Sequence, residues 1–112
     1  MATQNDEPYQ AVDCLTARDL IDRGEVYVID VRERREWDET GHIKGATLVP
    51  LNSFLRSPRE HLKQGDHVLF YCAMGQRSAV ASEMAAAVGL QHVYNLRDGI
   101  SDWIDKKLPV ER

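Results

Sequence analysis

The segment VLFYCAMGQRSAVASEMAAAV, residues 68–88, combines three patterns that determine its local structure. It begins with an apolar run over residues 68–71, which is typical of a buried strand. A short loop that contains a glycine and an arginine follows Cys72. Residues 79–88 are then rich in alanine, the residue with the highest helix propensity. The segment therefore predicts a strand, a loop and a helix, with Cys72 where the strand ends.

The position of Cys72 favours a reactive thiolate. The first N–H groups of a helix lack internal partners and carry partial positive charge, so a sulfur anion beside them is stabilised. Arg77 offers a permanently charged guanidinium for an oxyanion, and Gly75 permits a positive φ that turns loop amides inward. The alternative is a structural cysteine buried at a strand end. This alternative explains neither the arginine nor the glycine. The reactive interpretation requires an accessible sulfur with the amides turned toward it.

The loop and two further segments resemble the rhodanese family of sulfurtransferases. Residues 72–78 are similar to the family's active-site loop. The first family signature resembles Asp30-Val31-Arg32, Glu36-Trp37 and residues 41–46, and the C-terminal one resembles residues 93–96, 99–103 and 108–110. These blocks occur in the family's order and cover nearly the whole chain. Asp98 departs from the family, which often has a second glycine before Gly99.

This resemblance implies a single-domain sulfurtransferase that works by double displacement. Cys72 would attack the outer sulfur of a small anionic donor such as thiosulfate and keep that sulfur as a persulfide. Cyanide or a thiol, including a protein thiol, would then accept the sulfur, and no cofactor is required. The loop residues implied to line the site are Ala73, Met74, Gly75, Gln76, Arg77 and Ser78.

The spacing of the loop separates this chemistry from that of phosphatases. Cys72 and Arg77 form a C-x4-R pattern, whereas the phosphatases that resemble rhodaneses have C-x5-R and a wider cradle for a phosphoryl group. The shorter loop suits a single terminal sulfur, and Arg77 is expected to hold the departing oxyanion. A cysteine-dependent phosphatase or arsenate reductase, a sulfur carrier for a biosynthetic partner, and a non-catalytic binding or regulatory module are the alternatives.

Asp30, Arg32 and His42 are candidates for support of the site. Asp30 and Arg32 follow an apolar run at residues 26–29, and ligands bind at the carboxyl ends of strands in α/β sheets. A structural ion pair is favoured over a catalytic role for them. His42 could be a general base, but a partly buried histidine bonded to nearby backbone is favoured, since a low-pKa cysteine needs no separate base. Cys14 is expected to be a passive thiol, with a resolving thiol as the alternative.

Composition and charge restrict the partners of the protein. The chain has 112 residues, enough for one domain, and 14 Lys and Arg against 18 Asp and Glu give a net charge of −4. The sequence has no excess of basic residues, which a nucleic-acid-binding surface would need. No apolar run approaches the ~20 residues that cross a membrane. The histidines lack the close spacing that is typical of a metal site. With two cysteines and no secretory signal, a cytoplasmic location is expected.

Alternating strand and helix patterns predict an α/β fold in three layers, with a mainly parallel sheet and helices on both faces. The resemblance implies five strands. Residues 1–8 are expected to form a flexible lead-in and residues 9–112 a single domain. The expected strands are 9–12, 26–29, 46–49, 68–71 and 92–96, and the expected helical segments are 16–24, 33–40, 51–55, 58–64, 78–88 and 99–106.

Apolar side chains at helical spacing are expected to anchor the helices to the core. Thr16 is the expected N-cap of the first helix. The expected anchors are Leu15, Leu20 and Ile21 in the first helix, Trp37 in the second, Val80, Met84 and Val88 after the cysteine loop, and Ile100, Trp103 and Ile104 in the last helix.

Overall fold

The computed structural model describes residues 7–63 and 65–112, so most of the expected lead-in lies outside the described residues. It shows a five-stranded sheet in the order β1-β5-β4-β2-β3, and all neighbouring strands are parallel. The strands are β1 (Gln10–Val12), β2 (Tyr27–Asp30), β3 (Thr47–Leu48), β4 (His67–Tyr71) and β5 (His92–Leu96). The predicted α/β fold with five strands is confirmed.

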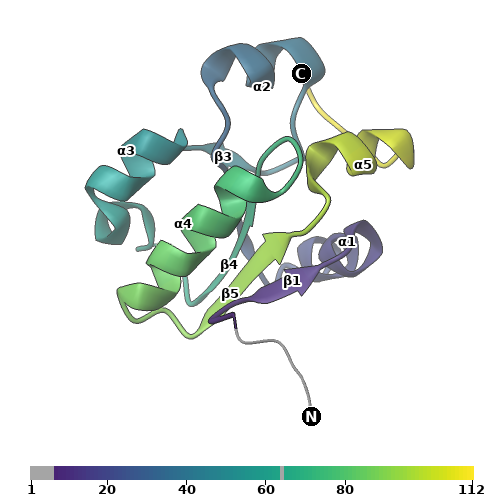
Figure 1. Ribbon diagram of the computed structural model, residues 1–112. Coiled ribbons are helices and arrows are strands. Elements are labelled where there is room, and N and C mark those ends of the chain that lie inside the picture. The colour runs from purple at the N-terminus through teal and green to yellow at the C-terminus, as the bar shows by residue number, and fades with distance from the viewer. Residues whose placement is uncertain (1–6, 64) are drawn as a thin grey trace.

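Helices cover both faces of the sheet, as expected (Figure 1). They are α1 (Cys14–Asp22), α2 (Arg34–Thr40), α3 (Leu51–Arg56), α4 (Gln76–Ala87) and α5 (Gly99–Asp105), with a short 3-10 helix at Pro58–His61. Ala81 of α4 packs in the same core cluster as Phe70. Trp103 of α5 packs in a second cluster with Leu69. Because adjacent strand residues point to opposite faces, these two clusters lie on opposite sides of β4.

β4 lies at the centre of the sheet because residues 68–71 are apolar and can be buried on both faces. It pairs with β2 on one side and with β5 on the other. In this register Asp30, the last residue of β2, lies opposite Tyr71, the last residue of β4. The segments that follow these two strands therefore leave the sheet at the same edge, which brings the first sequence signature beside the cysteine loop.

The first helix differs from its prediction at its start and on its buried face. It begins at Cys14, and the Asp13 side chain caps it by accepting a hydrogen bond of 2.8 Å from the Thr16 N–H. Thr16 is therefore not the N-cap. In this helix Cys14 and Ala17 are buried while Leu15 is exposed. Leu15 is thus wrong as an anchor.

The buried face of α4 is made of small residues, not of the predicted valine and methionine stripe. Its buried side chains are Ser78, Ala81, Ser82 and Ala85. Met84 packs only partly against the core, and Val80 is exposed. Small side chains allow the helix backbone to lie close to the sheet, and this close approach decides which face turns inward. The prediction for Val80 is wrong.

α2 is attached to the domain without a buried residue of its own. Trp37, the expected core anchor, is instead half-buried and stacks on the His42 ring with centroids 3.6 Å apart. Figure 1 shows α2 at the carboxyl ends of the strands, apart from the two helical layers. Polar contacts and this ring stack, not core packing, therefore hold α2 in place.

The last helix is anchored by part of the predicted set. Ile100 and Trp103 are buried, whereas Ile104 is exposed and is wrong as an anchor. Trp103 also donates a hydrogen bond of 2.8 Å from Nε1 to the Pro109 carbonyl, which ties the C-terminal segment to α5. Among the helices of residues 7–63 and 65–112, none is long and apolar enough to cross a membrane.

Candidate active site

Cys72 follows the last residue of β4, and the loop after it leads directly into α4. Gly75 adopts a left-handed conformation with φ of 102° as the N-cap of α4. A side chain at this position would also collide with the backbone carbonyl of Arg97. The predicted positive φ at Gly75 is confirmed, and this glycine lets the loop fold back over the sulfur.

Three donors of the loop converge on the Cys72 sulfur. The N–H of Gly75 lies 3.1 Å from Sγ, and the N–H and hydroxyl of Ser78 each lie 3.4 Å away. Burial of the sulfur raises its pKa and is the largest single influence. The hydrogen bonds from Ser78, Gly75 and Met74 together outweigh it, so the pKa of the Cys72 thiol lies below its ordinary value. The loop therefore favours the thiolate, as the sequence predicts.

The accessibility of the sulfur differs from the expectation. Cys72 is only 1% exposed, so in this conformation almost none of its surface can meet a donor. The physical reason is the tight return of the loop, because the amides that stabilise the sulfur also cover it. The expectation of an open sulfur is wrong for this conformation, and any attack by Cys72 requires the loop or its neighbours to shift.

The remaining loop residues form a neutral rim with an apolar tip. Met74 is 62% exposed, Gln76 is exposed and Ala73 is half-buried. Ser78 is buried, and its hydroxyl oxygen also lies 3.2 Å from the Gly75 carbonyl, so its single proton is shared between that carbonyl and the Cys72 sulfur. The rim thus presents an apolar side chain to solvent beside a buried sulfur.

Backbone hydrogen bonds from the start of α5 hold the cysteine loop in place. The N–H of Ile100 donates to the Cys72 carbonyl and the N–H of Ser101 donates to the Ala73 carbonyl, both at 3.0 Å. Gly99 has a φ of 74°, and a side chain there would collide with the Ala73 carbonyl. Asp98 has an ordinary φ of −101°. The departure at Asp98 therefore leaves this turn intact, because the glycine that the turn needs is Gly99.

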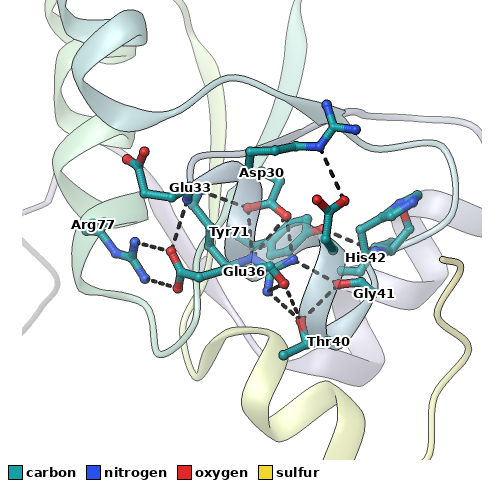
Figure 2. A network of polar contacts seen from close by, with 12 residues as sticks. Asp30, Glu33, Glu36, Thr40, Gly41, His42, Tyr71 and Arg77 are labelled. Carbon is teal, nitrogen blue, oxygen red and sulfur yellow. Dashed lines mark hydrogen bonds and ion pairs between the residues drawn. The ribbon is translucent and has the colours of Figure 1, made fainter.

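Asp30 and Arg32 form a buried ion pair at the carboxyl end of β2 (Figure 2). Nη2 of Arg32 lies 2.7 Å from Oδ2 of Asp30, and the same guanidinium donates to the Thr40 hydroxyl at 2.7 Å and to the Gly41 carbonyl at 2.9 Å. The Tyr71 ring lies beside it, 5.7 Å from the guanidinium carbon. The structure therefore has the structural ion pair that the sequence favoured at this strand exit.

His42 is held by its neighbours, not by the cysteine loop. Its Nδ1 lies 3.1 Å from the Ile43 carbonyl, and its ring stacks on Trp37. It is half-buried, and a short antiparallel bridge joins it to Glu111. These contacts match the favoured interpretation of a partly buried histidine bonded to nearby backbone.

Arg77 is bound by Glu36, a partner that the sequence did not indicate. Nη1 and Nη2 of Arg77 each donate to one oxygen of the Glu36 carboxylate at 2.8 Å (Figure 2). These hydrogen bonds lower the pKa of Glu36 to about 2 and raise the pKa of Arg77. The Arg77 guanidinium, which was expected to hold the oxyanion of a donor, is thus paired with a carboxylate of the same chain. The only sequence signal for Glu36 was its place in the first signature.

Cys14 lies in the other core cluster and is not part of this site. It is fully buried against α5, and its Sγ donates to Oδ2 of Asp102 at 3.4 Å. Burial is the main reason why the pKa of Cys14 is raised to about 12. Both cysteines are free thiols, and the surroundings of Cys14 agree with the expected passive role.

Comparison with known proteins relates the site to one family. The model of the family described as "Rhodanese-like domain" matches residues 13–106. "Putative sulfur carrier protein YrkF" of Bacillus subtilis is 33% identical over 79 residues, which are 70% of this chain and 42% of that protein. The human "Thiosulfate:glutathione sulfurtransferase" is 26% identical over 103 residues, covering 80% of this chain and 89% of that protein. The chain thus spans less than half of the first relative's length.

Solved structures show the same fold. A protein of unknown function from Rhodopseudomonas palustris, described as a "Possible Tyrosine Phosphatase", superposes with a TM-score of 0.79 at 27% identity. The match covers 92% of this chain and 85% of that one. The relatives' names therefore include both sulfur chemistry and phosphatase chemistry, and the loop itself has to distinguish them.

Proposed function

This chain belongs to the rhodanese-like domain family, and we propose that it is a sulfurtransferase that carries sulfane sulfur as a persulfide on Cys72. The observation that carries the proposal is the convergence of Gly75 and Ser78 donors on the Cys72 sulfur. These donors stabilise a thiolate, which is the nucleophilic form of cysteine. The names of two relatives, a sulfur carrier and a sulfurtransferase, agree with it.

In the first half-reaction, the Cys72 thiolate attacks the outer sulfur of a sulfane donor. A new S–S bond forms to Cys72, and the bond between the outer sulfur and the rest of the donor breaks. With thiosulfate as donor, sulfite leaves with the electron pair of that bond. The loop amides then face the persulfide sulfur in the manner of an oxyanion hole.

In the second half-reaction, a nucleophilic acceptor takes the outer sulfur. Its lone pair forms the new bond, and the S–S bond breaks to return the thiolate of Cys72. Cyanide becomes thiocyanate, and a thiolate becomes a persulfide, with a protein thiol as a further acceptor. This covalent intermediate gives ping-pong kinetics. We place the reaction in a reducing compartment such as the cytoplasm, where the Cys72 thiol stays unoxidised.

Intact mass spectrometry tests this function directly. After incubation with thiosulfate, the protein is expected to gain the mass of one sulfur atom and to lose it when cyanide is added. Cys72→Ser should show no gain, whereas Cys14→Ser, the matched control, should behave like the parent chain. A sulfur gain that persists in Cys72→Ser would remove Cys72 from the mechanism.

A non-catalytic module is the second candidate, and one observation favours it. The sulfur is 1% exposed and Arg77 is already paired with Glu36, so the described conformation is closed to a donor. The same mass measurement separates the two functions, because a binding module takes up no sulfur from thiosulfate, a small-molecule persulfide or a protein persulfide. An assay with an aryl phosphate tests the phosphatase alternative, and the C-x4-R spacing predicts no turnover.

A further inference from the structure

The ion pair between Glu36 and Arg77 joins α2 to the cysteine loop across a large distance in sequence. The two residues are 41 positions apart, and both hydrogen bonds between them are 2.8 Å long. Arg77 is 37% and Glu36 is 28% exposed on the side chain. The pair therefore lies at the surface beside the loop, where a small anion can approach Arg77 from solvent.

Glu36 is held in position independently of Arg77. Its Oε1 accepts a hydrogen bond of 3.0 Å from the N–H of Glu33, and together the two residues form a capping box at the start of α2. The carboxylate is thus placed by the helix start before it meets the guanidinium. A donor that enters this position has to compete with a carboxylate that is already fixed there.

The charge of the loop makes this competition decisive for the choice of donor. Arg77 is the only cationic residue among residues 73–78, which otherwise carry neutral side chains. With its charge matched by Glu36, the rim offers a dianion no uncompensated cation, and the carboxylate repels it. The exposed Met74 offers a polarisable apolar surface at the same rim.

We propose that Glu36 is a specificity-determining residue of this site, which selects against small dianionic donors and in favour of persulfides with an uncharged organic body. This inference rests on the proposed function, because it names the donor class for the same Cys72. A dianion such as thiosulfate must draw Arg77 away from Glu36, whereas an organic persulfide leaves the pair intact and contacts Met74 as its thiol departs.

Thiosulfate binding to the Cys72→Ser chain tests the proposal without turnover. The shifts of the Gly75 amide and the Arg77 side-chain Nε–H in NMR spectra report the dissociation constant. Glu36→Gln in this background keeps an acceptor for the Glu33 N–H but removes the charge. It is expected to bind thiosulfate about tenfold more tightly, the scale of one charge-assisted hydrogen bond. Adding Arg77→Ala should abolish the gain.

Glu39→Gln is the matched control. It removes one negative charge from the same helix at an exposed side chain, and Nη1 of Arg112 donates to the backbone carbonyl of Glu39 at 2.9 Å. Thiosulfate affinity is expected to change less than twofold in this variant. An equal gain in Glu36→Gln and Glu39→Gln would reduce the effect to net charge and overturn the specific role of Glu36.

Steady-state rates on the intact chain give the second measurement. Glu36→Gln should lower KM for thiosulfate, so the ratio of kcat/KM for thiosulfate to kcat/KM for 2-hydroxyethyl persulfide should rise. Unchanged or weaker thiosulfate binding in a folded Glu36→Gln chain would show that Glu36 only holds the Arg77 side chain in position and does not select the donor. If thermal unfolding shows that this variant is not folded, Glu36→Asp is the second variant, because it keeps the charge but shortens the reach to Arg77. Its thiosulfate affinity should exceed the parent's, since a shorter side chain pairs less closely with Arg77; an affinity equal to or below the parent's would overturn the proposal.

The outcomes for the proposed function are separate from these. If Cys72 gains no sulfur from any donor while Glu36→Gln still tightens thiosulfate binding, the sulfurtransferase function is wrong and Glu36 controls anion binding alone. If Cys72 gains sulfur and Glu36→Gln has no effect on thiosulfate, the function stands and the donor class is wrong.

Discussion

Ser78 meets the Cys72 sulfur with two groups, its backbone N–H and its hydroxyl, each at 3.4 Å. The residue is buried and lies in the first turn of α4, so neither group is shared with solvent. Hydrogen bonds to a charged acceptor are stronger than those between neutral groups. Ser78 therefore links the start of the helix to the ionisation of the cysteine.

Removing the hydroxyl should make the thiolate harder to form. In Ser78→Ala, the pKa of Cys72 is expected to rise by about one unit, the loss of one hydrogen bond to a charged group. The ultraviolet absorbance of the thiolate, followed from pH 5 to 10 in a Cys14→Ser background, measures the shift. Ser101→Ala, at an exposed serine, is the control and should leave the titration unchanged. An unchanged pKa in Ser78→Ala would mean that the amides alone hold the thiolate.

Gly99 and Gly24 offer a matched test of how the loop is supported. Their φ values are 74° and 69°, but a side chain at Gly99 would collide with the Ala73 carbonyl, whereas nothing lies within 4 Å of one at Gly24. Gly24→Ala should lower the free energy of unfolding by about 1 kcal/mol, the cost of the backbone conformation. Gly99→Ala should cost about 3 kcal/mol because strain and displacement of the loop add to it. Urea unfolding measures both, and equal losses would contradict the close approach.

Cys14 should make the protein less stable in alkali. Its pKa is raised from 9.0 to about 12 in the folded state, mainly by burial. The folded state therefore favours the protonated thiol, and this contribution to stability is complete below pH 9 and is lost as the pH rises toward 12. The parent chain is expected to lose about 2 kcal/mol more than Cys14→Ala between pH 8.5 and 11. Parallel urea unfolding curves measure this difference, and parallel pH dependence in the two chains would contradict it.

Much of the fold could be predicted from the sequence because local signals agreed with the tertiary structure. The apolar run at residues 68–71 can be buried only at the centre of a sheet with two covered faces, and it forms β4. Gly75 indicated a left-handed residue before the helix, which the structure has. The thiolate-stabilising loop followed from these two features, since strand end and helix start fix the direction of the amides.

The errors arose where a longer-range contact decided the outcome. Both Asp13 and Thr16 are suitable caps, and the packing of Cys14 against α5 selected Asp13. The buried face of α4 was set by how closely the helix approaches the sheet, which hydrophobic spacing does not encode. The Glu36 and Arg77 pair joins residues 41 positions apart. Such a contact has no local pattern, so the loop motif alone indicated an external anion as the partner of Arg77.

The dependence of the cysteine loop on α5 has a consequence for synthesis on the ribosome. Chains grow from the N-terminus, and β4 with Cys72 emerges well before Gly99, Ile100 and Ser101. Until these residues arrive, the carbonyls of Cys72 and Ala73 lack the amides that fix them in the finished protein. In a nascent chain, the hydrogen bonds that fix these two carbonyls of the cysteine loop can therefore form only after the start of α5 has emerged.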